Sequence, residues 1–399
     1  MAIQRNFSRV IVLIILSLTA VGGGSNLAGA GPLPAETVAG DPSTRPSVDV
    51  VFVLDTTGSM GGLIAAAKEK IWSIANTLAT ADPAPRIRMG LVGYRDRGDQ
   101  YVTVFTPLSD DLDAVYTQLM RFQADGGGDG PESVNQALHE AVIRPAWNPA
   151  PQAYRVIFLV GDAPPHMDYQ DDIKYAASCR LAVQRDIIVN TIQCGNLPET
   201  RPIWRQIARL SEGTYFQVAQ SGSAVLVDTP YDGDIAALSA RLDATRIYYG
   251  EAKQLARMEA RKREAETIYA SAAPSAVAKR TIFNSGKAGA KNFLGTQELV
   301  HDVQSGAVTL AEIEAAELPA EMRGMTPAQR EAHVAAQGAR RKALQDRIEE
   351  LAAKRQAYIH NKVKKDGEKG ENSLDAQIYR CLQKQAAEKQ IHYTRGPIY

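Results

Sequence analysis

Between residues 48 and 220 the chain alternates between short apolar runs and segments with helical periodicity. The first run, Val50–Leu54, is uninterrupted and made of β-branched, aromatic and aliphatic residues, which is typical of a strand buried on both faces. A similar run lies within 155–162, and the runs 86–95 and 101–108 are close enough to form an antiparallel hairpin at a sheet edge. This alternation predicts an α/β fold: a doubly wound, mostly parallel sheet with helices on both faces.

Polar side chains follow the first predicted strand directly. Asp55, Thr57 and Ser59 are spaced two residues apart in a glycine-containing turn. In open α/β sheets, ligands bind at the carboxyl ends of the strands. The run within 155–162 also ends in a carboxylate, Asp162. Because these side chains offer only oxygen atoms, they suit a hard divalent cation such as Mg²⁺.

The segment Asp55–Met60, DTTGSM, resembles the Asp-x-Ser/Thr-x-Ser motif of the von Willebrand factor type A (VWA) domain. In that family the motif forms a metal-ion-dependent adhesion site (MIDAS). The resemblance covers residues 48–220 and implies a Rossmann-like VWA fold. It also implies that Asp162, in the third loop of the site, helps to bind the ion, often through water.

The second loop departs from the family pattern. The family usually supplies a Thr, whereas GGGDGPE occupies residues 126–132 of this chain. The register of the following helix places Glu132 at the Thr position, while an insertion would instead present Asp129. The glycine neighbours of Asp129 favour it slightly, because they let a short side chain reach inward. A carboxylate from either residue would strengthen cation binding and weaken the attraction of the ion for an acidic partner.

These features predict a metal-ion-dependent module for protein–protein interaction or adhesion, without catalytic residues. The resemblance implies a divalent cation, with Mg²⁺ as the first choice and Mn²⁺ or Ca²⁺ as alternatives, that completes its coordination with a partner's acidic side chain or water. No phosphate-binding loop, GxSxG or HExxH motif is present in the sequence. Two rival functions stay open: a metal-assisted hydrolase using Asp129 and His166, and a scaffold in which the ion only stabilises loops.

The N-terminus has the layout of a secretory signal peptide over residues 1–30. Arg5 and Arg9 precede an apolar run, and small residues end at Ala30. The alternative is an uncleaved N-terminal anchor, although the run is short for a membrane span. Residues 31–47 are rich in Pro, Ala, Gly and Thr, which predicts a linker. We therefore expect a secreted or periplasmic protein, with a bacterial origin favoured and no membrane span after cleavage.

Disulfides form in oxidising compartments such as the periplasm, so a disulfide between cysteines of this chain has to be considered. Cys179 and Cys194 form a candidate pair if the helix and strand that carry them are neighbours. The alternative is that both are buried thiols that behave as small apolar side chains.

The composition changes after the predicted VWA domain. Residues 221–250 are predicted to be a connector, and residues 251–399 to be helical, partly coiled coil or disordered. Leu344, Ile348 and Leu351 recur at helical spacing, which favours an amphipathic or coiled-coil helix and self-association through this region. Lys plus Arg and Asp plus Glu both number 45, so the formal net charge is zero and no nucleic-acid partner is expected.

Overall fold

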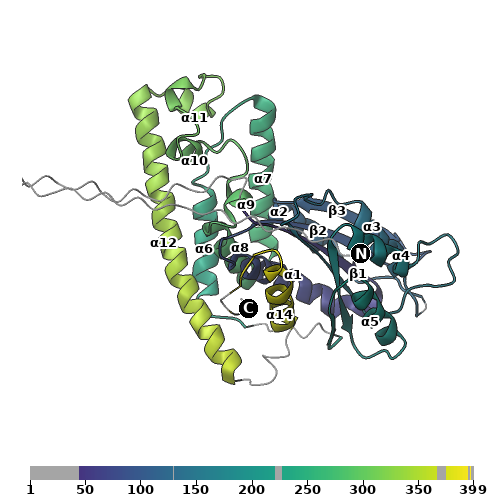
Figure 1. The fold of residues 1–399 in the computed structure, drawn as a ribbon. Helices are drawn as coiled ribbons and strands as arrows, with labels where there is room; N and C mark the ends of the chain where they lie inside the picture. Colours follow the sequence, from purple (N-terminus) through teal and green to yellow (C-terminus); the bar gives the residue numbers. More distant parts are fainter. Residues whose placement is uncertain (1–44, 129, 221–226, 366–373, 394–395, 397–399) are drawn as a thin grey trace, which may run out of the picture. The chain divides into compact units, whose positions relative to one another are not determined.

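The computed structural model describes residues 45–128, 130–220, 227–365, 374–393 and 396, all of them within one compact unit, Pro42–Tyr399 (Figure 1). The expected signal peptide, most of the expected linker and Asp129 lie outside the described residues. Within the described ranges, every helix is too short or too polar to cross a lipid bilayer.

A six-stranded sheet forms the centre of the fold, in the order β3-β2-β1-β4-β5-β6. All neighbouring strands pair in parallel except β3, which pairs antiparallel with β2 at one edge. Every residue of β1 is buried, as expected for a central strand. The predicted doubly wound, mostly parallel sheet is confirmed. The strands are β1 (Ser47–Asp55), β2 (Arg86–Tyr94), β3 (Thr103–Ser109), β4 (Tyr154–Gly161), β5 (Ile187–Cys194) and β6 (Tyr215–Val218).

Helices cover both faces of this sheet because successive side chains of a strand point to opposite faces. Phe52 and Leu54 belong to one core with α1 (Gly61–Ala79) and α2 (Leu112–Arg121). Val51 and Val53 belong to a second core on the other face. The helices of that second face are α3 (Val134–Ile143), α4 (Tyr175–Gln184) and α5 (Thr200–Leu210).

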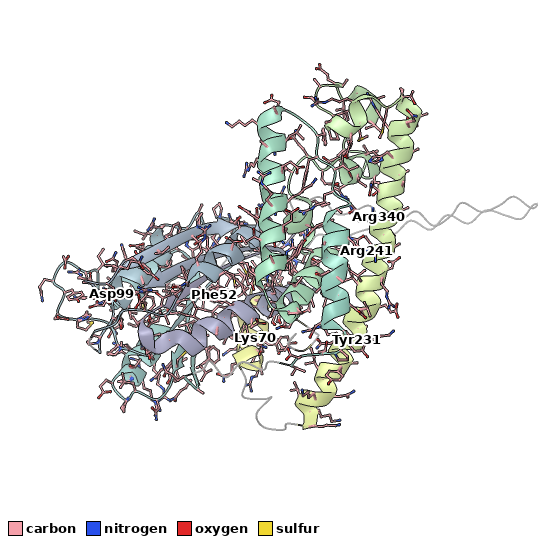
Figure 2. All side chains as sticks on the ribbon, turned by 180° about the vertical axis from the view of Figure 1, so that it is seen from behind. Phe52, Lys70, Asp99, Tyr231, Arg241 and Arg340 are labelled. Atoms are coloured by element: carbon pink, nitrogen blue, oxygen red, sulfur yellow. The ribbon has the colours of Figure 1, made fainter. Side chains whose placement is uncertain are left out.

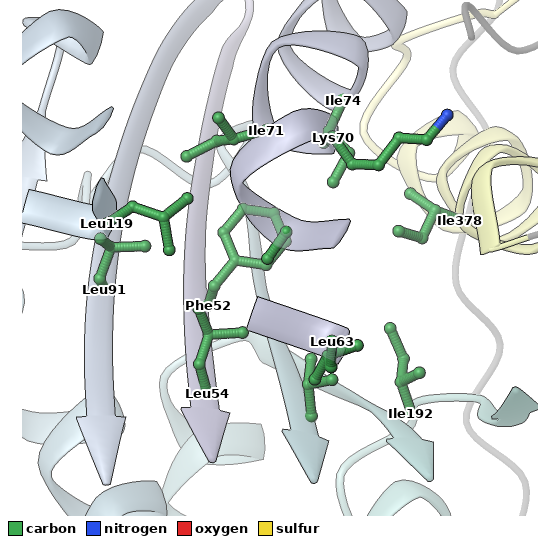
Figure 3. A pocket seen from close by; sticks show the side chains of 12 residues that line it. Phe52, Leu54, Leu63, Lys70, Ile71, Ile74, Leu91, Leu119, Ile192 and Ile378 are labelled. Carbon is green, nitrogen blue, oxygen red and sulfur yellow. The ribbon is translucent and has the colours of Figure 1, made fainter. Parts of the chain in front are cut away.

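The C-terminal helix α14 (Leu374–Ala387) also packs on the sheet, beside α1 (Figure 1). Its residues Ile378 and Leu382 are buried in the same core as Phe52 and α1. Ile378, Phe52 and the stem of Lys70 line a small apolar cavity of about 40 Å³. Figure 3 shows Ile378 on the side of α14 and Phe52 on the sheet. The sheet face next to α1 is therefore completed by a helix that follows β6 by more than 150 residues in the sequence.

Polar contacts fix the position of α14 as well. Gln385 accepts a hydrogen bond from the Tyr154 hydroxyl at 2.7 Å and exchanges two with the Asn190 amide, at 2.9 and 3.1 Å. The ammonium of Lys70 lies 2.9 Å from the carboxylate of Asp375, and both side chains are buried. Buried polar groups need partners, so these contacts define where the helix sits on the sheet.

The remaining helices form a layer built around α12, with two apolar clusters. Leu344, Ile348 and Leu351 of α12 are buried against α6 and α8, so the apolar positions from which we expected a coiled coil pack within the chain. Figure 2 shows α6, which carries Arg241, running alongside α12, which carries Arg340. The helices are α6 (Asp232–Asp243), α7 (Ala252–Ser271), α8 (Pro274–Ser285), α9 (Ala290–Leu294), α10 (Leu299–Gln304), α11 (Ala320–Arg323) and α12 (Pro327–Lys365).

Arg280 of α8 joins this layer to the sheet-containing part. Its guanidinium makes two hydrogen bonds of 2.6 Å to the carboxylate of Asp113 in α2. The same group donates to Asp243 and Ser239 of α6, both at 3.1 Å. Helix α6 lies in the predicted connector, residues 221–250. It is therefore a packed helix that shares a buried ion cluster with α2 and α8.

The hypothesised disulfide between Cys179 and Cys194 is wrong. All three cysteines are free and buried. Cys179 lies in the core with α3 to α5, whereas Cys194 lies in the core with α1, on the other face of the sheet. Because the sheet separates the two side chains, they behave as small apolar residues, which was the stated alternative.

Candidate metal centre

The first loop of the site follows β1, and its three predicted residues lie together. The Asp55 carboxylate is fully buried, and its Oδ1 accepts hydrogen bonds from the Thr57 amide at 2.9 Å and the Thr57 hydroxyl at 2.6 Å. The Thr57 hydroxyl lies 3.4 Å from that of Ser59. Burial raises the pKa of Asp55 to about 7 against these hydrogen bonds, which lower it, and the charge of Asp162 adds to the rise.

The second loop is held against the first by its backbone. The Gly58 amide donates to the Gly126 carbonyl at 3.1 Å, and the Gly127 amide donates to the Asp99 carboxylate at 3.1 Å. Gly126 has a φ of +77°, and a Cβ there would lie 2.3 Å from Asp99 Oδ1. The left-handed backbone favours glycine at this position, and any Cβ there would have to displace the Asp99 carboxylate.

Glu132 is the second-loop carboxylate that the structure brings to the site. Its amide donates to the Pro164 carbonyl at 2.9 Å, and its carbonyl accepts from the His166 amide at 3.0 Å, so the backbone bridges the second and third loops. Its side chain is only 3% exposed. Burial, together with the charges of Asp55 and other nearby carboxylates, raises the pKa of Glu132 to about 9. Glu132 lines the cavity between the loops, whereas Asp129, the other candidate of the second loop, lies outside the described residues.

The third loop begins at Asp162, directly after β4, and its carboxylate faces the first loop. Asp162 Oδ2 accepts a hydrogen bond of 2.6 Å from the side-chain amide of Gln220. Sequence reasoning missed Gln220, because a single polar residue after a short strand carries no signal that links it to a loop 58 residues earlier. The predicted residues Asp55, Thr57, Ser59, Glu132 and Asp162 all lie at this one edge of the sheet.

A cavity of about 230 Å³ lies between the three loops, and among the described residues its lining includes no Lys, Arg or His. Asp55 Oδ2 and Glu132 Oε2 are buried and have no hydrogen-bond partner. Burial without a partner disfavours the charged form of both carboxyl groups, and a cation beside them would favour that form. The residues that line the cavity are Thr57, Gly58, Ser59, Gly126, Gly127, Gly130, Glu132, Asp162, Ala163 and Leu197.

These side chains fit a hard divalent cation. Carboxylate and hydroxyl oxygens are the donors that Mg²⁺, Mn²⁺ and Ca²⁺ prefer. Over the described ranges, no three His, Cys, Asp or Glu side chains cluster closely enough to hold a metal by themselves. The hydroxyl groups of Thr57 and Ser59 would therefore have to complete such a site together with the carboxylates.

His166 does not line the cavity. Its Nδ1 lies 2.8 Å from the Asp168 carboxylate and its Nε2 lies 3.3 Å from that of Asp96. Its ring stacks on that of Tyr169, with the ring centroids 4.1 Å apart. These contacts hold His166 beside the site and outside the lining of the cavity.

Comparison with known proteins agrees with this geometry. Residues 49–230 match the family model of the von Willebrand factor A domain. The chain is 38% identical over 98 residues to human von Willebrand factor A domain-containing protein 7, a match covering 25% of this chain and 10% of that protein. It is 25% identical over 146 residues to an ariadne-like RING finger protein of Acanthamoeba polyphaga mimivirus, covering 37% of this chain and 14% of that protein.

Two solved structures show a distant resemblance of the fold. One is proximal thread matrix protein 1 from the mussel byssus with a zinc-occupied MIDAS motif, with a TM-score of 0.35 and 15% identity over 44% of this chain and 42% of that chain. The other is the SpRpn10 VWA domain, with a TM-score of 0.34 and 12% identity over 44% of this chain and 88% of that chain.

Proposed function

We propose that this VWA domain is a protein-interaction module that binds its partner through a divalent cation. The carboxylates of Asp55, Glu132 and Asp162 and the hydroxyls of Thr57 and Ser59 would hold the ion. The observation that carries this proposal is the unpartnered carboxylate oxygen of Glu132, a buried residue that lines a cavity without a basic side chain. A second unpartnered carboxylate oxygen belongs to Asp55, which precedes the lining residues Thr57 and Ser59 in the first loop. A cation would supply the missing positive charge, and its remaining coordination position would accept an acidic side chain of the partner.

Glu132 affects both the affinity of the site for the ion and the attraction of the bound ion for the partner. A carboxylate at the position of the usual Thr adds one negative charge to the site, which favours retention of the cation. The same charge reduces the residual attraction of the ion for a partner's carboxylate. The partner must therefore gain affinity from contacts outside the ion.

Exposed apolar side chains of the cavity lining and of the third loop offer those contacts. Leu197 lines the cavity and is 39% exposed, and Met167 and Ile173 of the third loop are each 47% exposed. These are three of the five large apolar side chains that are exposed in the described part of the chain. We therefore infer a protein partner that presents an acidic side chain flanked by apolar residues.

The place of action we propose is the bacterial periplasm or exterior, on the basis of the signal-like residues 1–30. N-terminal sequencing of the protein recovered from these compartments should find a mature chain that begins close to Gly31. Recovery of the intact Met1 end would contradict this part of the proposal.

Isothermal titration of the full chain with Mn²⁺, Mg²⁺ and Zn²⁺ tests the cation site. Wild type should bind one equivalent of ion, and Asp55→Ala should bind none. Asp234→Ala, which removes an exposed carboxylate on α6, is the matched control and should bind as wild type does. Equal binding by wild type and Asp55→Ala would rule out the site.

Capture of a partner from extracellular extract, with and without a chelator, tests the interaction itself. We expect the chelator to abolish capture by wild type. If chelation lowers only the thermal stability and capture persists, the ion stabilises loops and does not contact the partner.

A further inference from the structure

Gln220 lies two residues after β6 and spans the outer side of the candidate metal centre. Its side-chain amide donates to Asp162 Oδ2 at 2.6 Å and to the Ser59 carbonyl at 3.3 Å. The two acceptors belong to the third and first loops of the site. One exposed side chain therefore bridges two of the three loops that would hold the ion.

The β5–α5 loop provides room for this amide. Gly195 has a φ of +71°, and a Cβ at this position would lie 2.3 Å from Gln220 Oε1. The Gly195 amide donates to the Val218 carbonyl at 2.9 Å, which holds this loop beside the end of β6. The carbonyl end of Gln220 thus occupies a space that any larger residue at 195 would fill, while its NH₂ end points to the carboxylate.

We propose that Gln220 is an intramolecular cover of the cation site. In the absence of the ion, its NH₂ group donates a hydrogen bond to the Asp162 oxygen. This hydrogen bond must break when the ion binds. An N–H donor and a cation, or a water held by the cation, compete for the same lone pairs. This inference rests on the proposed function, because it assigns the competitor of the same ion.

The cover lowers the apparent affinity for the ion, since binding must first break the hydrogen bond to Asp162. A hydrogen bond of this kind has a net effect equivalent to about a three- to tenfold change in a binding constant. A substitution that keeps the volume of Gln220 but removes its donor should therefore tighten cation binding by about that factor.

Titration of the full chain with Mn²⁺ measures this effect on wild type, Gln220→Leu and Gln220→Glu. Both variants lack the donor, and the second also places a carboxylate beside Asp162, so both should bind Mn²⁺ about three- to tenfold more tightly than wild type. Gln152→Leu, an exposed glutamine before β4 at the opposite edge of the sheet, is the matched control and should not change the affinity. Thermal unfolding without metal checks that each variant is folded.

Two sets of results separate this inference from the proposed function. If wild type binds Mn²⁺ and Asp55→Ala does not, but Gln220→Leu binds equally well or more weakly, the cover is overturned and the cation site stands. Weaker binding would make Gln220 a ligand rather than a competitor. If wild type binds no Mn²⁺ at Asp55, the proposed function and the cover both fall.

Discussion

Deletion of the chain after Lys365 should prevent the VWA domain from folding stably, although the deleted part lies far beyond residue 230. Helix α14 and the residues after it contribute five large apolar side chains that are at most 9% exposed: Ile378, Tyr379, Leu382, Ile391 and Tyr393. Burial of each such side chain contributes about 1.5–3 kcal/mol, so together they contribute about 8–15 kcal/mol before the entropy cost of ordering the helix is subtracted. The free energy of unfolding of a whole domain is about 5–15 kcal/mol.

Urea unfolding followed by circular dichroism measures this contribution. The truncated chain should lack a cooperative transition or unfold at a far lower urea concentration than the full chain. Leu382→Ala is a milder perturbation of the same helix. Replacing a fully buried leucine with alanine lowers the free energy of unfolding by about 2–5 kcal/mol. Lys384→Ala, an exposed position on the same helix, is the control and should stay within about 0.5 kcal/mol of wild type. A truncated chain that unfolds at the same urea concentration as the full chain would refute the reasoning.

Three further predictions concern single residues. Arg280→Met should lower the free energy of unfolding, measured with urea at pH 7, by about 3–5 kcal/mol, because it leaves the Asp113 carboxylate buried without its partner. The double variant with Asp113→Leu should regain most of the lost stability. A double variant as unstable as Arg280→Met would contradict this explanation. Burial and neighbouring cations lower the pKa of Lys279 to about 7, below the value in the unfolded chain. Between pH 7 and 10 the unfolded chain therefore binds more protons than the folded chain. The free energy of unfolding should rise over this pH range. Lys279→Met should flatten that rise, and an unchanged slope would count against the burial of the ammonium. Gly126→Ala should lower the free energy of unfolding by about 1–2 kcal/mol, because the backbone at this position is left-handed. It should also weaken Mn²⁺ binding, because the new Cβ displaces Asp99. Unaltered Mn²⁺ affinity would show that this glycine does not shape the site.

The sheet was predictable because its signals are local. Each strand is a compact apolar run, and the loop carboxylates follow those runs directly, so Asp55 and Asp162 were placed by counting from the ends of β1 and β4. The antiparallel edge strand β3 followed in the same way from its short connection to β2. The match to the VWA family model spans residues 49–230, whereas our predicted domain spans residues 48–220.

The features that were missed depend on contacts between distant segments. Gln220 meets Asp162 only because β6 lies beyond β5 in the sheet, and no local pattern marks it. Helix α14 lies in the region predicted to be helical, but its place on the sheet depends on partners such as Asn190, nearly 200 residues away. Helix α8 lies in the same region, but its packing was not predicted, because its buried face carries Lys279 and Arg280, which resemble a solvent-exposed pattern until their partners are known.

The most direct test of the central claim is anomalous diffraction from crystals of the full chain soaked in Mn²⁺. We predict one strong peak in the cavity between the three loops, in contact with oxygens of Ser59, Glu132 or Asp162, and no such peak in Asp55→Ala crystals. A wild-type cavity that holds no manganese under saturating conditions, or a peak that persists unchanged in Asp55→Ala, would contradict the account.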